Sequence, residues 1–171
     1  MNLDDKSVVY CDANFLVTYS IKNPQEPDLQ KQAKILFMNL LAAKCRIAIS
    51  PLAFDEAWNG IRKAVGVNKD NAKFFGFLNN NMQLSYPDVL GELEVFTKNI
   101  LKHKNVAVVQ LVDSSEGVIN ALGKLNVLKP RDAFHLVMAL DNGSSHMITN
   151  DGKLKIEAEK SGIACLDFDK S

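Results

Sequence analysis

The sequence predicts an α/β fold, a single three-layer α/β/α domain over residues 1–171 with a mainly parallel central sheet. Short apolar segments alternate with amphipathic segments along the whole chain, as expected when helices connect parallel strands. The short segments are continuously apolar, which is typical of strands that are covered on both faces. A chain of 171 residues is long enough for one domain with a substantial core, and short for two.

The predicted strands are short apolar runs bounded by polar or turn residues. They are SVVYCD (7–12), RIAIS (46–50), VAVVQLV (106–112), HMIT (146–149) and IACLDF (163–168). Parallel pairing of these segments is expected, with 7–12, 106–110 and 146–149 adjacent in the centre of the sheet.

Between the strands, apolar residues recur at helical spacing behind recognisable start signals. Helices are predicted at 13–20, 28–44, 50–65, 114–126, 129–143 and 151–162. Asp28 is the expected cap of the second helix. Ser50 and Pro51 are a cap followed by proline at the first helical position, which is a strong start signal.

The region at about 69–104 is predicted to form two further helices separated by SYPD (85–88). It contains Phe74, Phe75 and Phe77, and we expect it to provide a hydrophobic surface for a homodimer or another partner protein.

Composition limits the classes of function. Twenty basic and twenty acidic residues give zero net charge, which argues against a protein that merely coats nucleic acid. The N-terminus lacks a signal peptide and no apolar run is long enough to span a bilayer, so we expect a cytoplasmic protein without membrane partners. The cysteines, Cys11, Cys45 and Cys165, are odd in number and share no metal-type spacing, which favours free thiols.

Carboxylates recur where predicted strands end and helices begin. Asp12 ends the first strand, Asp151 follows the fourth, Asp132 lies in the first turn of a helix, and Asp55 and Glu56 lie in the helix after RIAIS. Each acid taken alone could be a helix cap, a partner of the helix dipole or a solvated side chain.

Taken together, these acids indicate a cation site. All the positions lie at the carboxyl edge of a parallel sheet, where ligands bind in such folds. Converging carboxylates repel one another unless a cation offsets their charge. Oxygen ligands without a histidine or cysteine cluster suit Mg²⁺ or Mn²⁺. Such a site either holds a phosphate or hydrolyses a phosphodiester.

Four stretches, VVYCDANFLV, SPLAFDEAW, KPRDAFHLVMAL and MITNDGKL, resemble in order the four motifs of the PIN-domain family across nearly the whole chain. The resemblance implies a PIN-like domain and a divalent-metal-dependent ribonuclease that cleaves RNA. Many bacterial and archaeal members of that family are toxins of the VapC type, which implies an antitoxin protein as a partner.

The resemblance also implies roles for the acids. Asp12, Asp132 and Asp151 would hold Mg²⁺ or Mn²⁺, with Glu56 as a further ligand or as general base. Helical geometry alone does not choose between Asp55 and Glu56, and only the resemblance selects Glu56. A second acid common after the fourth motif is replaced here by Lys153, so tight binding of two metal ions is not implied.

Polar neighbours of the acids have both functional and structural interpretations. The family pattern favours Asn14 as a residue that orients Asp12, whereas Thr149 could support the site or simply favour a strand. His135 lies on the same helix face as Asp132, where a structural, hydrogen-bonded histidine is the favoured interpretation.

Basic residues beside the acids are candidates for contacts to substrate phosphates. Arg131 and Lys63 are the first of these, and Lys153 could contact phosphate or be a solvated helix residue.

Three other functions could use part of this pattern. A haloacid-dehalogenase-like phosphatase also has an aspartate after its first strand, but needs a second aspartate where this chain has Asn14. A receiver-type signalling domain would need an acidic pair that does not stand out. The third is a PIN-like protein that has lost activity and serves as a binding module. A PIN-like protein that processes or binds RNA without a toxin role is a further alternative to the toxin.

Overall fold

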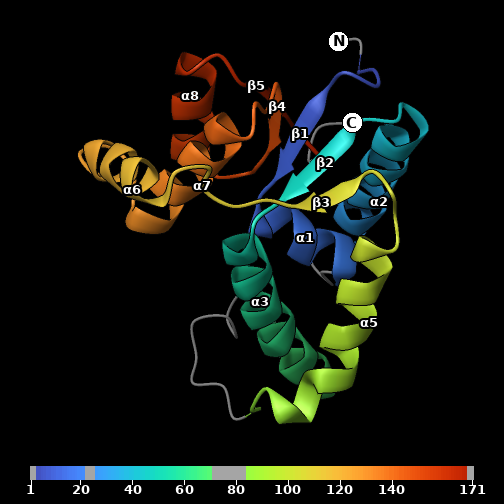
Figure 1. The fold of residues 1–171 in the computed structure, drawn as a ribbon. Helices are drawn as coiled ribbons and strands as arrows, with labels where there is room; N and C mark the ends of the chain where they lie inside the picture. The colour runs from blue at the N-terminus through green and yellow to red at the C-terminus, as the bar shows by residue number, and fades with distance from the viewer. Residues whose placement is uncertain (1–2, 22–25, 71–83, 169–171) are drawn as a thin grey trace.

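A five-stranded, fully parallel sheet forms the centre of the computed structural model, which describes residues 3–21, 26–70 and 84–168 (Figure 1). The strand order is β3-β2-β1-β4-β5. The strands are β1 (Val8–Cys11), β2 (Arg46–Ile49), β3 (Val106–Val108), β4 (His146–Ile148) and β5 (Ala164–Leu166). The predicted α/β class with a parallel sheet is confirmed.

Seven α-helices and one short 3₁₀ helix accompany the sheet in the described residues. They are α1 (Ala13–Ser20), α2 (Pro27–Ala42), α3 (Pro51–Asp70), η1 (Pro87–Val89), α5 (Leu90–Leu101), α6 (Ser114–Gly123), α7 (Pro130–Asp141) and α8 (Gly152–Lys160). Within these residues, none of the helices is both long and apolar enough to cross a membrane.

The helix starts show which local predictions were correct. The hydroxyl oxygen of Ser50 accepts a hydrogen bond from the backbone N–H of Ala53 at 3.1 Å, so Ser50 caps α3 as predicted. Asp28 is not the cap of α2, because that helix begins one residue earlier, at Pro27, and places Asp28 in its first turn. Proline fits this first position because its missing N–H has no partner there anyway.

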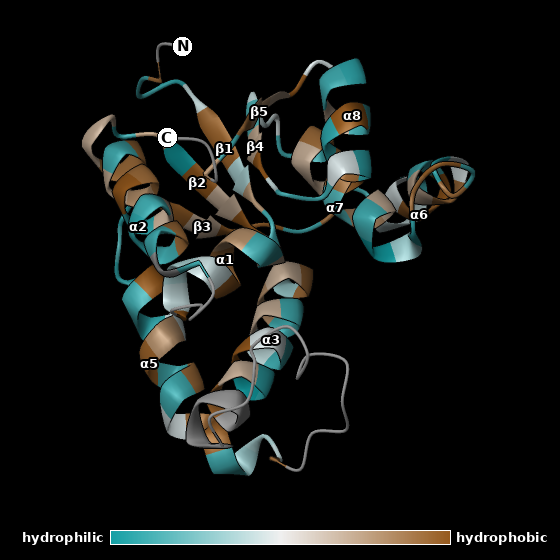
Figure 2. Ribbon diagram, turned by 180° about the vertical axis from the view of Figure 1, so that it is seen from behind, coloured by the Kyte–Doolittle hydropathy of each residue, from teal (hydrophilic) through white to brown (hydrophobic). Residues whose placement is uncertain are grey.

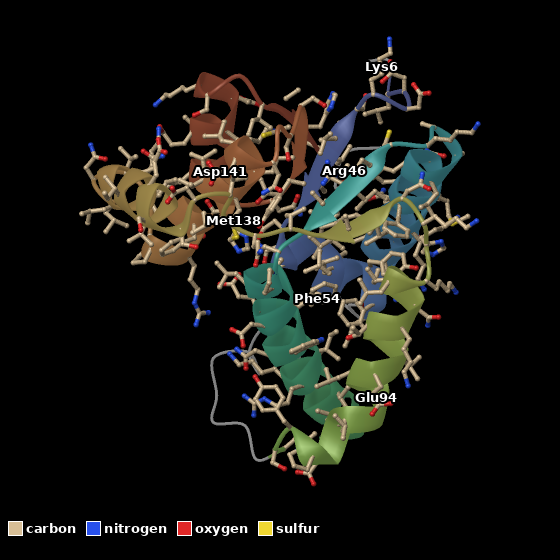
Figure 3. All side chains as sticks on the ribbon, in the orientation of Figure 1. Lys6, Arg46, Phe54, Glu94, Met138 and Asp141 are labelled. Atoms are coloured by element: carbon tan, nitrogen blue, oxygen red, sulfur yellow. The ribbon has the colours of Figure 1, made fainter. Side chains whose placement is uncertain are left out.

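The helices cover both faces of the sheet, which gives the predicted three layers (Figures 1 and 2). Val9 and Cys11 of β1 point to the face covered by α1, α2, α3 and α5, whereas Tyr10 points to the face covered by α6, α7 and α8. Phe54 of α3 packs edge to face against Phe96 of α5, and Figure 3 shows it between these two helices. The site-bearing strand β1 is therefore enclosed on both faces.

The predicted strand order was wrong in one respect. Residues 106–108 form β3 at the edge of the sheet and pair only with β2 among the described strands. β2 lies between β3 and β1. The edge position agrees with burial, since Val108 is 52% exposed whereas Ile47, Ala48 and Ile49 are fully buried. An apolar run shows that a strand forms, but it does not show which strand it pairs with.

The helical region predicted at about 69–104 is described only in part. Its second half contains η1 and α5, which supports a helical segment there. Phe74, Phe75 and Phe77, which were expected to form a dimer surface, lie outside the described residues. Self-association through this region stays a prediction.

Helices α1 and α3 approach each other closely at Gly60. A Cβ atom added at Gly60 would lie 2.6 Å from Cγ2 of Val17, and the β-branched valine has little freedom to turn aside. Glu56 lies one turn before Gly60 on α3, so this contact fixes α3 against α1, the helix that follows Asp12.

We therefore expect Gly60→Ala to destabilise the protein, although alanine is the better helix former by about 1 kcal/mol. Overpacking against Val17 should cost roughly 1–3 kcal/mol, and urea unfolding measures the balance. Gly123→Ala is the matched control, since a Cβ there meets no atom within 4 Å. A Gly60→Ala protein as stable as Gly123→Ala would contradict this account of the α1–α3 contact.

Candidate metal centre

Asp12 lies at the carboxyl end of β1, where the chain turns into α1. Its side chain is the N-cap of α1 and accepts a hydrogen bond from the backbone N–H of Ala13 at 2.6 Å. Its other carboxylate oxygen accepts a hydrogen bond from the hydroxyl of Thr149 at 2.8 Å. Because β1 is the middle strand, this capping residue is only 4% exposed.

Burial makes Asp12 unlike an ordinary capping residue. Loss of solvation raises the pKa of the Asp12 carboxyl, although His135, Thr149 and the Ala13 N–H oppose the shift. The charge of Glu56 adds to the rise. A carboxylate in such a position favours a nearby positive charge, which a cap alone does not require.

Glu56 reaches Asp12 from the first half of α3. One oxygen of Glu56 accepts a hydrogen bond from Nε2 of His135 at 3.0 Å, and the other forms an ion pair with Arg131 at 3.2 Å. Nε2 of His135 also lies 3.5 Å from Asp12 Oδ1. Asp55, by contrast, is exposed and lines a separate groove with Trp58 between α3 and α5. The structure thus distinguishes the two acids that helical geometry left open.

The charges of this cluster lower the pKa of Glu56 and raise the pKa of His135. For Glu56, burial raises the pKa, but the hydrogen bond and charge of His135, together with Arg131, outweigh it and lower the pKa. For His135, burial lowers the pKa, but Glu56, Asp12 and Asp132 outweigh it and raise the pKa. His135 and Arg131 are thus the groups that offset the charge of these carboxylates.

Behind His135, a chain of buried hydroxyl groups enters the core. The Tyr10 hydroxyl lies 2.7 Å from Nδ1 of His135 and 2.7 Å from the hydroxyl of Ser50. Tyr10, Ser50 and His135 are at most 1% exposed. The imidazole is therefore held from both of its nitrogen atoms.

Asp132 lies near enough to both Asp12 and Asp151 for their charges to act on it. Burial raises the pKa of Asp132, and the nearby charges of Asp151 and Asp12 raise it further. Asp151 is the N-cap of α8, where Oδ1 accepts hydrogen bonds from the N–H groups of Lys153 and Leu154, each at 2.9 Å. Both acids line one groove of about 620 Å³.

Thr149 connects the two halves of the cluster. Its hydroxyl donates to Asp12 and accepts from the backbone N–H of Asp151 at 3.1 Å. Asn14 is exposed, and its amide lies 3.4 Å from Asp12 Oδ2, at the long end of hydrogen bonding.

Basic residues line two grooves that also contain acids of the site. One groove, of about 530 Å³, lies beside α1 and α3 and is lined by Glu56, Arg131 and Lys63 among others. The groove that contains Asp132 and Asp151 is also lined by Lys129 and Lys153. Each groove therefore combines acids of the site with basic side chains.

The donor set suits a divalent cation. Asp12, Glu56 and His135 each offer one ligand atom, and these atoms lie within 4.8 Å of one another. Asp132 and Asp151 are not part of that compact group, but the charge of Asp132 raises the pKa of His135, and the charges of Asp12 and Asp151 raise the pKa of Asp132. Carboxylate oxygens are preferred ligands of hard cations, and a buried aspartate among like charges would be stabilised by such an ion.

No protein-family model matches this chain, and no curated protein sequence matches it significantly. The structure itself shows an α/β fold, a parallel sheet and a cluster of buried acids with a histidine at the carboxyl edge of the sheet. The likeness to PIN domains depends on the four motifs alone.

Three residues of the cluster have no role in the site that the sequence alone predicts. The sequence favours a structural role for His135, a place in an apolar strand for Tyr10 and a helix cap for Ser50. The spacing of Asp132 and His135 on one helix face was the one indication available.

The pKa shifts predict how stability depends on pH when EDTA removes divalent ions. The pKa values of Asp12 and His135 are raised above ordinary values of 3.8 and 6.5, so the folded state binds more protons than the unfolded state above these values. The lowered pKa values of Glu56 and His146 act in the opposite direction, but only near and below their ordinary values of 4.5 and 6.5. The free energy of unfolding should therefore fall as the pH rises above about 6.5 and passes through the raised pKa of His135.

Urea unfolding in EDTA at several pH values measures this fall. Asp12→Asn should make the fall of the unfolding free energy with pH less steep. The change removes a carboxyl whose pKa is raised, and it removes a charge that raises the pKa of His135. Asparagine caps a helix about as well as aspartate. Stability that rises with pH over this interval, or an equal slope in the variant, would contradict the assigned electrostatics.

Proposed function

We propose that this protein is a divalent-metal-dependent endoribonuclease of the PIN type, with Asp12, Glu56, Asp132 and Asp151 as the residues that hold Mg²⁺ or Mn²⁺. One observation carries the proposal. Acids from four separate segments, the buried Asp12 among them, lie at the carboxyl edge of a parallel sheet, and the four motifs that contain them resemble those of PIN domains.

The chemistry follows from the charges of the site. When bound there, a divalent cation activates water and offsets the charge on the attacked phosphate. Asp12 contributes a carboxylate that Thr149 and the start of α1 hold in place. Glu56 is a further ligand or the general base, and it lies at the open side of the cluster, where its side chain is 19% exposed.

The flanking grooves support an extended polyanion as substrate. A phosphodiester placed over the acids would continue into a groove on either side, one with Arg131 and Lys63 and the other with Lys129 and Lys153. Lysine and arginine are the usual partners of phosphate oxygens in nucleic-acid complexes. A single RNA strand satisfies both grooves, whereas a small phosphoester would leave one of them unused.

A phosphatase of the haloacid-dehalogenase type is less well supported. Its acid–base aspartate would stand at Asn14, whose amide is exposed and cannot donate or accept a proton in catalysis. Release of inorganic phosphate from small phosphoesters, without cleavage of RNA, would favour that alternative.

The partners of the protein are proposals, as its activity is. A toxin role, with an antitoxin protein as partner, and a homodimer through the region of residues 69–104 are consistent with the resemblance. An RNA-processing or RNA-binding role without a toxin activity is the alternative.

The pair of neighbouring acids on α3 gives the sharpest test. Glu56→Gln should reduce Mg²⁺- or Mn²⁺-dependent cleavage of a labelled single-stranded RNA by about 100-fold or more, because the site loses a charged ligand or its base. Asp55→Asn, the adjacent change of the same chemical type, should leave the rate within about twofold, because the exposed Asp55 carboxylate lies on another groove.

Gel analysis of single-turnover cleavage, with and without EDTA, provides the measurement. Equal activity of the two variants, or cleavage by the wild-type protein that EDTA does not affect, would contradict the proposed function.

A further inference from the structure

We propose that His135 is a positioning residue of this centre rather than a ligand: it keeps its proton on Nε2 and donates it to Glu56, and the hydroxyl groups of Tyr10 and Ser50 fix this orientation. The inference rests on the proposed function for the role of Glu56, but the state of the imidazole can be measured separately.

The direction of the buried hydrogen bonds carries the argument. The Ser50 oxygen accepts from the Ala53 N–H, which leaves the Ser50 hydroxyl proton free to donate to Tyr10. The Tyr10 hydroxyl then donates to Nδ1 of His135. With Nδ1 as an acceptor, the neutral ring carries its proton on Nε2, which faces the Glu56 carboxylate at 3.0 Å.

The opposite direction leaves one donor unsatisfied. If His135 bound a metal ion through Nε2, its proton would lie on Nδ1 and be donated to Tyr10. Tyr10 would then donate to Ser50, which already accepts from Ala53. Within the described part of the chain, the Ser50 hydroxyl proton would have no acceptor, and a fully buried O–H without an acceptor is costly.

The consequence is a carboxylate held on both sides. Glu56 accepts from Nε2 of His135 on its buried side and pairs with Arg131 on its open side. Both carboxylate oxygens thus have a defined direction before substrate or metal binds. Residues that orient a ligand in this way commonly change metal affinity by about 10- to 100-fold when they are altered.

The tautomer of His135 can be read from long-range ¹H–¹⁵N spectra of the full chain, in EDTA and in saturating Mg²⁺. The chain has three histidines, so His103 and His146 serve as internal references. We expect Nε2 to be protonated under both conditions, with Nδ1 as an acceptor in Mg²⁺. An Nδ1–H tautomer, or a doubly protonated ring in saturating Mg²⁺, would overturn the proposal.

Mn²⁺ affinity, measured by titration calorimetry, tests the effect on the site. Tyr10→Phe keeps the ring but removes the hydroxyl, and should weaken Mn²⁺ binding by about tenfold or more. Tyr19→Phe is the matched control, because Tyr19 packs against Phe15 and Phe37 away from the acids. Equal Mn²⁺ affinity of the two variants, each shown to be folded by circular dichroism, would overturn the positioning role.

Two substitutions at His135 distinguish the effect of its hydrogen-bond donor from the effect of its side-chain volume. His135→Gln retains an N–H donor near Glu56 and should bind Mn²⁺ more tightly than His135→Leu, which lacks a donor. If the wild-type protein does not cleave RNA although His135 carries its proton on Nε2, the result contradicts the nuclease assignment alone. An Nδ1–H tautomer in an active nuclease would count against the role of His135 alone.

Discussion

Burial of the Asp12 carboxylate is the constraint on which the rest of the site depends. The residue must cap α1 and end the middle strand, so it cannot avoid being enclosed between two helical layers. An enclosed carboxylate needs positive charge or hydrogen-bond donors. Thr149 and the Ala13 N–H supply donors, and His135 supplies a polar partner with a raised pKa. A divalent cation would supply the further positive charge that this carboxylate needs.

This constraint answers whether an aspartate at a strand–helix junction is a cap or a functional group. Asp12 is a cap by geometry, and so is Asp151. Capping uses only Oδ1 of each residue, so the second carboxylate oxygen is available for another role. The neighbours of Asp12 indicate such a role, because a helix cap does not need Glu56, His135 and Thr149 around it.

The extent of successful prediction differs between the fold and the site. Alternation of apolar and amphipathic segments was enough for the α/β class, because burial on both faces leaves a clear pattern in each strand. Strand order was not predictable in the same way, since β2 and β3 are both short and apolar and pairing is decided by long-range packing. Asp28 is ambiguous in the sequence, because aspartate is favoured both at the N-cap and in the first turn of a helix.

The hydrogen bonds behind the site could not have been predicted from motifs. Tyr10 is 40 residues from Ser50 and 125 residues from His135 in the sequence, and only the strand register brings their side chains together. Tyr10 faces the layer opposite to Val9 and Cys11 because successive strand residues alternate. A polar residue within an apolar strand is therefore the feature to examine in similar sequences.

Location of a bound ion by crystallography tests the central claim most directly. Crystals soaked in Mn²⁺ and measured near the manganese absorption edge should show an anomalous peak in contact with carboxylate oxygens of Asp12 and Glu56, at roughly 2–2.3 Å. Asp132 and Asp151 should lie around the same ion, directly or through water. A peak elsewhere on the protein, or no peak among these acids at saturating Mn²⁺, would contradict the account.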